Sequence, residues 1–190
     1  LADISGNPYM EEACMRVAEL SYDKKEYRTA QYYFQRMYEV ASNNQMRQAA
    51  LLGVLRCSNN VQDHATTIDY ASKLLEIESI DEIIRNEALY YRATVQYTNH
   101  EYGQALVDYN ILAKEVRTEW GAEAKYKAAE CYYHLGSIDM AEQEIMAFTS
   151  MQTSHQYWLA KSLILLADIN IDKNDLFQAK QYLLALQNNY

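Results

Sequence analysis

The sequence predicts an all-α fold, a solenoid of about five stacked pairs of antiparallel helices, and three observations lead to this prediction. First, a small residue recurs at nearly constant spacing, at Ala30, Thr67, Ala105, Ala141 and Ala179. Second, apolar residues follow each of these positions at helical spacing, as Phe34 and Met37 follow Ala30. Third, a single Pro and five Gly leave little material for the tight turns that an all-β fold needs.

Each repeat is expected to contain two amphipathic helices joined by a short polar turn. The expected turns lie at 23–26, 59–63, 98–101, 134–137 and 172–175. The expected repeats are approximately 11–47, 48–85, 86–121, 122–159 and 160–190, in a single array that spans 1–190. A hairpin of this kind cannot bury both of its faces by itself, so the repeats have to stack on one another.

Charge and hydropathy limit the classes of partner. The 190 residues have a formal net charge of −9, from 17 Lys and Arg against 26 Asp and Glu. A protein that binds nucleic acid through the phosphate backbone needs the opposite balance, so no nucleic-acid partner is expected. No long uncharged apolar run is present, so direct insertion into a membrane is not expected either. Because the sequence opens with Leu1, we expect it to be excised from a longer protein.

Residues that could take part in catalysis or metal binding are few and scattered. Cys14, Cys57 and Cys131 lack a CxxC pattern and are expected to be free thiols packed between helices. Cys131 and His134 lie one helical turn apart and could share a metal ion, but no second pair accompanies them. Because HExxH, GxSxG and a Gly-rich phosphate loop are all missing from the sequence, we expect no catalytic residues, no metal site and no cofactor.

The repeated pattern resembles the tetratricopeptide repeat. The fourth copy, which begins at Tyr126, is the most similar and reads YKAAECYYHLGSIDMAEQEIMAF. The resemblance covers about residues 8–190 and implies a right-handed α-solenoid. The second copy departs most from the pattern, since it has no turn Gly and places Thr67 where Ala is usual. Arg92 and Lys125 stand at positions where the family has apolar residues, and we expect their charged ends to reach solvent.

The resemblance also implies which side chains face the concave surface, because the first helix of each repeat lines it. The implied partner-binding residues are Met15, Glu19, Tyr22, Leu52, Arg56, Asn59, Tyr90, Tyr97, Tyr126, Glu130, Tyr133, Ile164, Asp168 and Ile171. We expect the four Tyr of the third and fourth repeats to form an open aromatic stripe, with Glu130 attracting basic residues of a partner. Only Arg56 and Asn59 fit the family's clamp for a terminal carboxylate, so that clamp is not expected.

Two functions are compatible with this sequence. One is a non-catalytic scaffold whose concave groove holds a peptide segment or helix of another protein. That segment is expected to carry basic residues. The alternative is a structural spacer within a longer repeat array. The last copy, with YWLAK, LILLADI and FQAK, also resembles the terminal repeat of long tetratricopeptide proteins of Gram-negative cell envelopes, often assigned to TonB or Tol-Pal systems. That resemblance implies a periplasmic or envelope-associated location, with the cytoplasm as the alternative.

Overall fold

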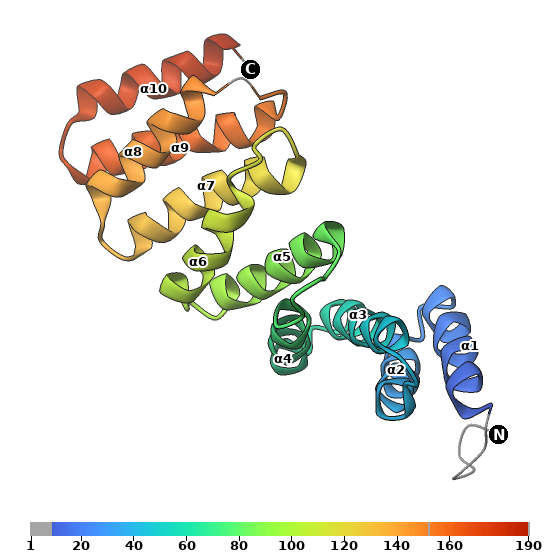
Figure 1. The fold of residues 1–190 in the computed structure, drawn as a ribbon. Coiled ribbons are helices and arrows are strands. Elements are labelled where there is room, and N and C mark those ends of the chain that lie inside the picture. The colour runs from blue at the N-terminus through green and yellow to red at the C-terminus, as the bar shows by residue number, and fades with distance from the viewer. Residues whose placement is uncertain (1–8, 152, 190) are drawn as a thin grey trace. The chain divides into compact units, whose positions relative to one another are not determined.

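The computed structural model describes residues 9–151 and 153–189, and in this part of the chain every regular element is an α-helix (Figure 1). The helices are α1 (Met10–Asp23), α2 (Tyr27–Val40), α3 (Asn44–Asn60), α4 (His64–Leu75), α5 (Glu82–Thr98), α6 (Tyr102–Leu112), α7 (Glu119–His134), α8 (Ile138–Ser150), α9 (Gln156–Asp172) and α10 (Leu176–Asn189). The prediction of an all-α fold is confirmed.

The chain divides into two compact units, which we call the N-terminal unit, up to Val95, and the C-terminal unit, from Gln96 onward. In the N-terminal unit, α1 packs on α2, α2 on α3 and α3 on α4. In the C-terminal unit, α6 packs on α7, α7 on α8, α8 on α9 and α9 on α10. Packing between consecutive helices is the arrangement expected of stacked helix pairs, and it confirms the predicted fold class.

The recurring small residues are all buried in the helix packing. Ala30, Thr67, Ala105 and Ala141 have no exposed surface, and Ala179 is 3% exposed. Thr67, the exception in the series, has a hydroxyl that must be satisfied inside the core. Its Oγ1 atom lies 2.9 Å from the carbonyl oxygen of Asp63 and 3.0 Å from Oγ of Ser58, which is also buried. The second repeat therefore compensates for its departure from Ala with local hydrogen bonds.

The three cysteines are free and fully buried, as the sequence predicted. Cys14 and Cys57 belong to one core cluster with Ala30, Phe34 and Met37, among others. Burial raises the pKa of Cys57 and of Cys131 to about 12. Both thiols therefore stay protonated near neutral pH and behave as small apolar side chains.

The turns inside the repeats share one backbone conformation. In each, one residue adopts a positive φ two positions before the second helix begins, namely Lys25, Gln62, His100, Gly136 and Asn174. Around each of them the backbone forms the same pair of hydrogen bonds, for example Gln62 N to Asn59 O at 3.2 Å and Asp63 N to Ser58 O at 2.9 Å. This pattern, a Schellman motif, satisfies the last carbonyl groups of the first helix. Glycine is usual at the left-handed position, yet only one of the five turns has it.

Gln62→Gly is expected to stabilise the protein by roughly 0.5–1 kcal/mol, because glycine adopts a positive φ without the steric cost that an L side chain has. Gln62 is exposed, so no packing is lost. Urea unfolding followed by circular dichroism measures the change. As a control, Ala65→Gly on the exposed face of α4 is expected to destabilise by a similar amount. A loss of stability for Gln62→Gly would contradict the assigned turn conformation.

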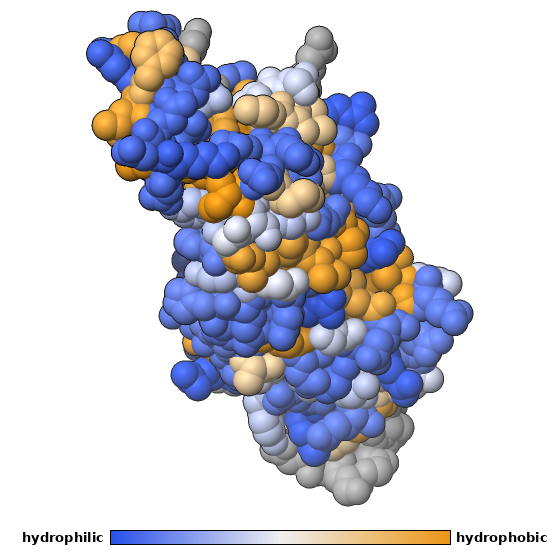
Figure 2. All heavy atoms as spheres, turned by 90° about the vertical axis from the view of Figure 1, so that its left-hand side faces the viewer, coloured by the Kyte–Doolittle hydropathy of each residue, from blue (hydrophilic) through white to orange (hydrophobic). Residues whose placement is uncertain are grey.

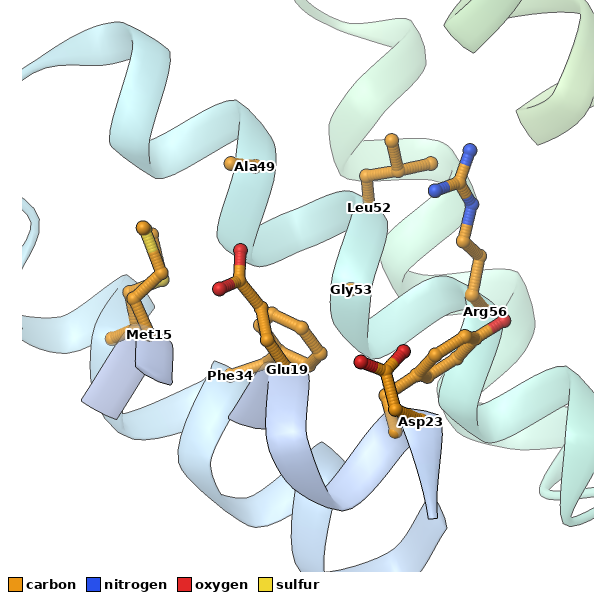
Figure 3. Close-up of a pocket in the computed structure, with 10 residues that line it drawn as sticks. Met15, Glu19, Asp23, Phe34, Ala49, Leu52, Gly53 and Arg56 are labelled. Atoms are coloured by element: carbon orange, nitrogen blue, oxygen red, sulfur yellow. The ribbon is translucent and has the colours of Figure 1, made fainter. Parts of the chain in front are cut away.

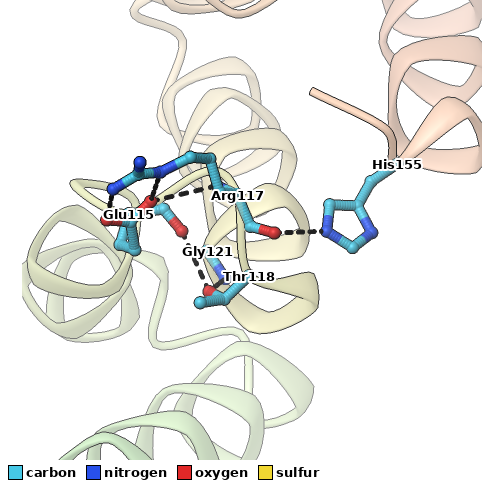
Figure 4. Close-up of polar contacts among 5 residues, drawn as sticks. All are labelled: Glu115, Arg117, Thr118, Gly121 and His155. Atoms are coloured by element: carbon cyan, nitrogen blue, oxygen red, sulfur yellow. Dashed lines mark hydrogen bonds and ion pairs between the residues drawn. The ribbon is translucent and has the colours of Figure 1, made fainter. Parts of the chain in front are cut away.

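In the C-terminal unit, polar contacts hold the loop before α7 (Figure 4). The Thr118 side chain accepts a hydrogen bond from Gly121 N at 3.0 Å and so caps the first turn of α7. The same hydroxyl donates to the carbonyl oxygen of Glu115 at 2.9 Å. From the start of α9, His155 Nε2 lies 2.9 Å from the carbonyl oxygen of Arg117. These contacts join the loop before α7 to the loop before α9.

The face of the molecule drawn in Figure 2 is mostly hydrophilic, with some apolar side chains between the hydrophilic ones. Leu176 and Phe177, at the start of α10, are 63% and 73% exposed.

Of the two charged residues expected to reach solvent, Arg92 donates from Nη1 to Ser72 Oγ at 3.0 Å. Lys125 forms an ion pair with Glu144, and both of these side chains are mostly buried. Lys125 therefore uses an ion pair where the sequence predicted contact with solvent.

Candidate binding site

Five of the predicted concave residues line a single cavity in the N-terminal unit, which we call the N-terminal cavity (Figure 3). Its volume is about 270 Å³. Met15, Glu19 and Tyr22 come from α1, and Leu52 and Arg56 come from α3. Asn59 and Tyr90, the other two predicted residues of this unit, are not among the lining residues. The remaining lining residues are Asp23, Phe34, Met37, Ala49 and Gly53.

The N-terminal cavity has an apolar floor and an acidic rim. Phe34 and Met37 of α2 are 9% and 0% exposed, so they belong to the core beneath the cavity. Glu19 and Asp23 are exposed and stand four residues apart on α1, which places them on the same side of that helix. Figure 3 shows both carboxylates extending from α1 toward α3. Asp23 was not predicted from the sequence, although its spacing of four residues from Glu19 was a usable signal.

Arg56 forms an ion pair with Glu87 within the N-terminal unit. Its Nε lies 2.7 Å from Glu87 Oε1 and its Nη2 lies 2.8 Å from Glu87 Oε2, so the pairing is bidentate. The hydrogen bond to Glu87 raises the pKa of Arg56, against the opposing effect of burial. Glu87 is 6% exposed and its charge is satisfied by this contact. Arg56 therefore adds little positive charge to the N-terminal cavity.

The two carboxylates on the rim, by contrast, are unpaired. Among the residues that the structure describes, Glu19 and Asp23 have no hydrogen-bond or ion-pair partner for their side chains. With Arg56 neutralised by Glu87, the mouth of the N-terminal cavity is left with a negative charge. A negative mouth favours approach of a positively charged group.

Gly53 shapes this cavity because α2 and α3 approach closely there. A Cβ atom added to Gly53 would lie 2.5 Å from Cγ and Cδ1 of the Phe34 ring. A contact this short forces the ring or the helix to move. The missing side chain therefore allows Phe34 to form the floor of the cavity.

Gly53→Ala is expected to destabilise the N-terminal unit by about 1–3 kcal/mol, the usual cost of overpacking. Without the clash, the same change inside a helix would stabilise by roughly 0.5–1 kcal/mol. Urea unfolding of Gly53→Ala, of Phe34→Leu and of the double variant measures the coupling between the two positions. Phe34→Leu should relieve part of the cost of Gly53→Ala. Greater stability of Gly53→Ala than of the parent chain would refute the close approach.

A second cavity, the C-terminal cavity, collects the predicted residues of the last two repeats. Tyr126, Glu130 and Tyr133 of α7 line it together with Ile164 and Asp168 of α9, and its volume is about 240 Å³. His134, Lys161 and Leu165 complete the lining. Ile171, which was also predicted, is 48% exposed and is not among the lining residues.

Glu130 differs from the free acidic residue that the sequence predicted. Its Oε2 accepts a hydrogen bond from Lys127 Nζ at 2.8 Å, and its Oε1 accepts one from the Tyr126 hydroxyl at 2.6 Å. Burial tends to raise the pKa of Glu130, but the hydrogen bonds from Lys127 and Tyr126 outweigh it and the pKa is lowered. Lys127 Nζ also lies 3.9 Å from the centre of the Tyr97 ring. Since Lys127 already pairs with Glu130, this carboxylate attracts a basic partner only weakly.

The expected open aromatic stripe is also corrected in part. Tyr126 is 4% exposed and stacks on Trp158 of α9, with ring centres 5.7 Å apart. Tyr97 is half-buried and packs edge-on against Tyr102 at 5.4 Å. Both rings thus pack within the C-terminal unit, and besides the nearby Tyr102, Tyr97 also contacts the ring of His134, with ring centres 6.1 Å apart.

The other two Tyr of the predicted stripe retain partial exposure. The Tyr133 hydroxyl donates to Asp172 Oδ2 at 2.5 Å, and this hydrogen bond raises the pKa of Tyr133 to about 12. Tyr90 is half-buried and belongs to the N-terminal unit, where it packs against Tyr91 with ring centres 5.9 Å apart. That Tyr90 belongs to the same aromatic stripe as the other three Tyr stays a prediction.

The possible metal pair has a packing role instead. The His134 ring stacks on Tyr102, with centres 4.5 Å apart and planes inclined by 15°. Cys131 is fully buried. Across residues 9–151 and 153–189, no group of three or more His, Cys, Asp or Glu is arranged to hold a metal ion. The geometry of this pair is that of a helix end packed against its neighbour.

Comparisons with known proteins agree with this architecture. The family model described as the TT21 fifth ARM repeats domain matches residues 11–133. None of the curated proteins matches the chain. No helix in the described part of the chain has the length and apolar character needed to cross a membrane.

Several solved structures share the fold. MamA from Desulfovibrio magneticus RS-1 superposes with a TM-score of 0.71 at 14% identity, over 94% of this chain and 93% of that one. A Podosopora anserina kinesin light chain structure, whose TPR-like repeats are nearly identical to one another, gives a TM-score of 0.65 at 12% identity to this chain, over 96% of both chains. A tetratricopeptide repeat protein from Parabacteroides merdae gives 0.50 at 14% identity, over 97% of this chain and 81% of that one. At these identities the similarity establishes the fold alone.

Proposed function

Because the chain belongs to the family of the TT21 fifth ARM repeats domain, we propose that it is a non-catalytic scaffold for protein–protein interaction. It binds a peptide segment or helix of another protein along the faces of its first helices. One observation supports this more than any other. Residues of the first helices in neighbouring repeats line a cavity in each unit, at positions where repeat proteins present extended binding surfaces.

The two units differ in how well they suit this role. The N-terminal cavity has unpaired carboxylates and an apolar floor, so a partner can gain both hydrophobic and electrostatic contacts there. In the C-terminal cavity, Tyr126 is buried and Glu130 is neutralised by Lys127. These contacts favour the alternative function, that of a structural spacer, for the C-terminal unit. We therefore assign binding first to the N-terminal unit.

The proposal also includes the chemistry and location of the partner. The net charge of −9 favours a partner with basic residues over nucleic acid. The resemblance of residues 155–190 to envelope repeat proteins adds a periplasmic setting, with the cytoplasm as the alternative. Cell fractionation of the source organism distinguishes these two locations.

Peptide display on the purified chain tests the scaffold function. A library of random peptides is panned on the immobilised protein, and enriched peptides are then offered to variants that carry a photo-reactive benzoylphenylalanine. At Ala49, which is exposed and lines the N-terminal cavity, we expect cross-linking to the peptides. At Tyr32, which is 49% exposed on α2 and does not line the cavity, we expect none. Absence of any enriched peptide, or cross-linking from position 32 alone, would support the spacer function.

A further inference from the structure

We propose that the N-terminal cavity binds a partner segment that combines one large apolar side chain with a nearby Lys or Arg. The apolar side chain enters the cavity, and the basic side chain pairs with Glu19 and Asp23 on its rim. This inference rests on the proposed scaffold function and specifies the chemistry of the partner at one site.

The volume of the N-terminal cavity suits a single side chain. A cavity of about 150 Å³ is large enough for benzene, so about 270 Å³ accommodates a Phe, Leu or Met side chain together with part of a neighbouring aliphatic stem. Pockets for whole small molecules usually have roughly 300–1,000 Å³. The space is therefore better matched to an anchoring residue of a polypeptide.

The walls of the cavity favour an apolar anchor. Phe34 and Met37 close the bottom and are buried, while Met15 and Leu52 are half-buried on either side. An entering side chain covers the exposed parts of Met15 and Leu52, and apolar area removed from water stabilises a complex. The Met15 side chain is also unbranched and adapts its shape, so the cavity can accept anchors of different outline.

The charges at the mouth of the N-terminal cavity account for the basic residue of the proposed partner segment. Glu19 and Asp23 are unpaired among the described residues, whereas the single cation that lines the cavity, Arg56, is held by Glu87 in a bidentate pair. An acidic peptide or a terminal carboxylate would meet two negative charges and no free cation among the described residues that line the cavity. A Lys or Arg next to the apolar anchor meets two carboxylates four residues apart on α1. Charge complementarity therefore selects an apolar and basic segment.

The experiment uses peptides enriched by display on the whole chain and labelled with fluorescein. Fluorescence anisotropy measures their dissociation constants. We expect the enriched peptides to share a Phe, Leu or Met within four residues of a Lys or Arg. Replacing the apolar residue of a peptide with Ser, or its basic residue with Gln, should weaken binding at least roughly tenfold. These changes lie in the peptide, so they leave the fold of the protein untouched.

A matched pair of protein variants tests whether the basic residue of the peptide binds to Glu19 and Asp23 on the rim. Glu19→Gln combined with Asp23→Asn should weaken binding roughly tenfold and remove most of its dependence on salt. Glu76→Gln combined with Glu78→Gln removes the same charge from exposed positions in the same unit that do not line the cavity. This control should bind nearly as well as the parent chain. Equal losses for the two variants would mean that only the net charge matters, which would overturn the proposal.

The outcomes separate this inference from the scaffold function. If enriched peptides cross-link at position 49 yet lack the shared basic residue, the scaffold function stands and the inference is wrong. The same conclusion follows if Glu19→Gln with Asp23→Asn leaves the dissociation constant unchanged. If no peptide binds the chain, the scaffold function and this inference fail together.

Discussion

Ala105→Glu is expected to unfold the C-terminal unit or to destabilise it by about 3–5 kcal/mol, since it buries an unpaired charge. Ala105 has no exposed surface, and the buried ring of Tyr109 follows it by one helical turn. A typical domain is stable by only about 5–15 kcal/mol, so a loss of this size removes much of its stability. Thermal unfolding followed by circular dichroism provides the measurement.

Val107→Glu is the matched control on the same helix. Val107 is 61% exposed, so a carboxylate at this position stays in water. The expected change in stability is within about 0.5 kcal/mol. If both variants unfold at nearly the temperature of the parent chain, Ala105 does not lie at a close helix contact and the repeat pattern is misassigned in the third repeat.

Gly121→Ala is expected to cost about 3 kcal/mol, the upper part of the range for overpacking, because the clash is with the backbone. A Cβ atom at position 121 would lie 2.0 Å from the carbonyl oxygen of Glu115 and 2.6 Å from its carbonyl carbon. The loop can move away only by disturbing Thr118, which caps α7 and also bonds to Glu115 (Figure 4). Differential scanning calorimetry measures the expected fall in melting temperature.

Gly103→Ala distinguishes this clash from the general effect of a methyl group on a helix. Gly103 lies in the first turn of α6, and an added Cβ meets no atom within 4 Å. Ala is the better helix former, so this variant is expected to gain up to roughly 1 kcal/mol. A gain for both variants would show that the loop before α7 adapts at no cost, contrary to the geometry around Glu115.

The helices and the contacts of the repeating small residues could be predicted from the sequence because they depend on local pattern. Apolar spacing decides which face of a helix is buried, and Ala30 and its counterparts lie on those buried faces. The resemblance to the tetratricopeptide repeat implied that Met15, Glu19 and Leu52 face one surface, and the structure places all three around one cavity. These features depend on residues a few turns apart, within one repeat or between adjacent ones.

The turn conformations were less predictable. A glycine signals a positive φ from sequence, and Gly136 fits that rule. Gln62 and His100 adopt the same conformation with no such signal, because the packing of the two helices they join requires it. The cost of about 1 kcal/mol per residue is offset by the helix contacts on both sides.

Whether a charge or a ring is available to a partner was decided by the tertiary structure alone. The family resemblance implied that Arg56, Tyr126 and Glu130 lie on the concave faces of first helices, and all three do line cavities. Arg56 is nevertheless neutralised by Glu87, 31 residues away, and Tyr126 is covered by Trp158 of α9, 32 positions along the chain. Such pairings depend on the distances between side chains of different helices, which periodicity within one helix does not contain. Local pattern therefore determined which faces the helices present, and packing between repeats determined that the rim of the N-terminal cavity keeps its free negative charge.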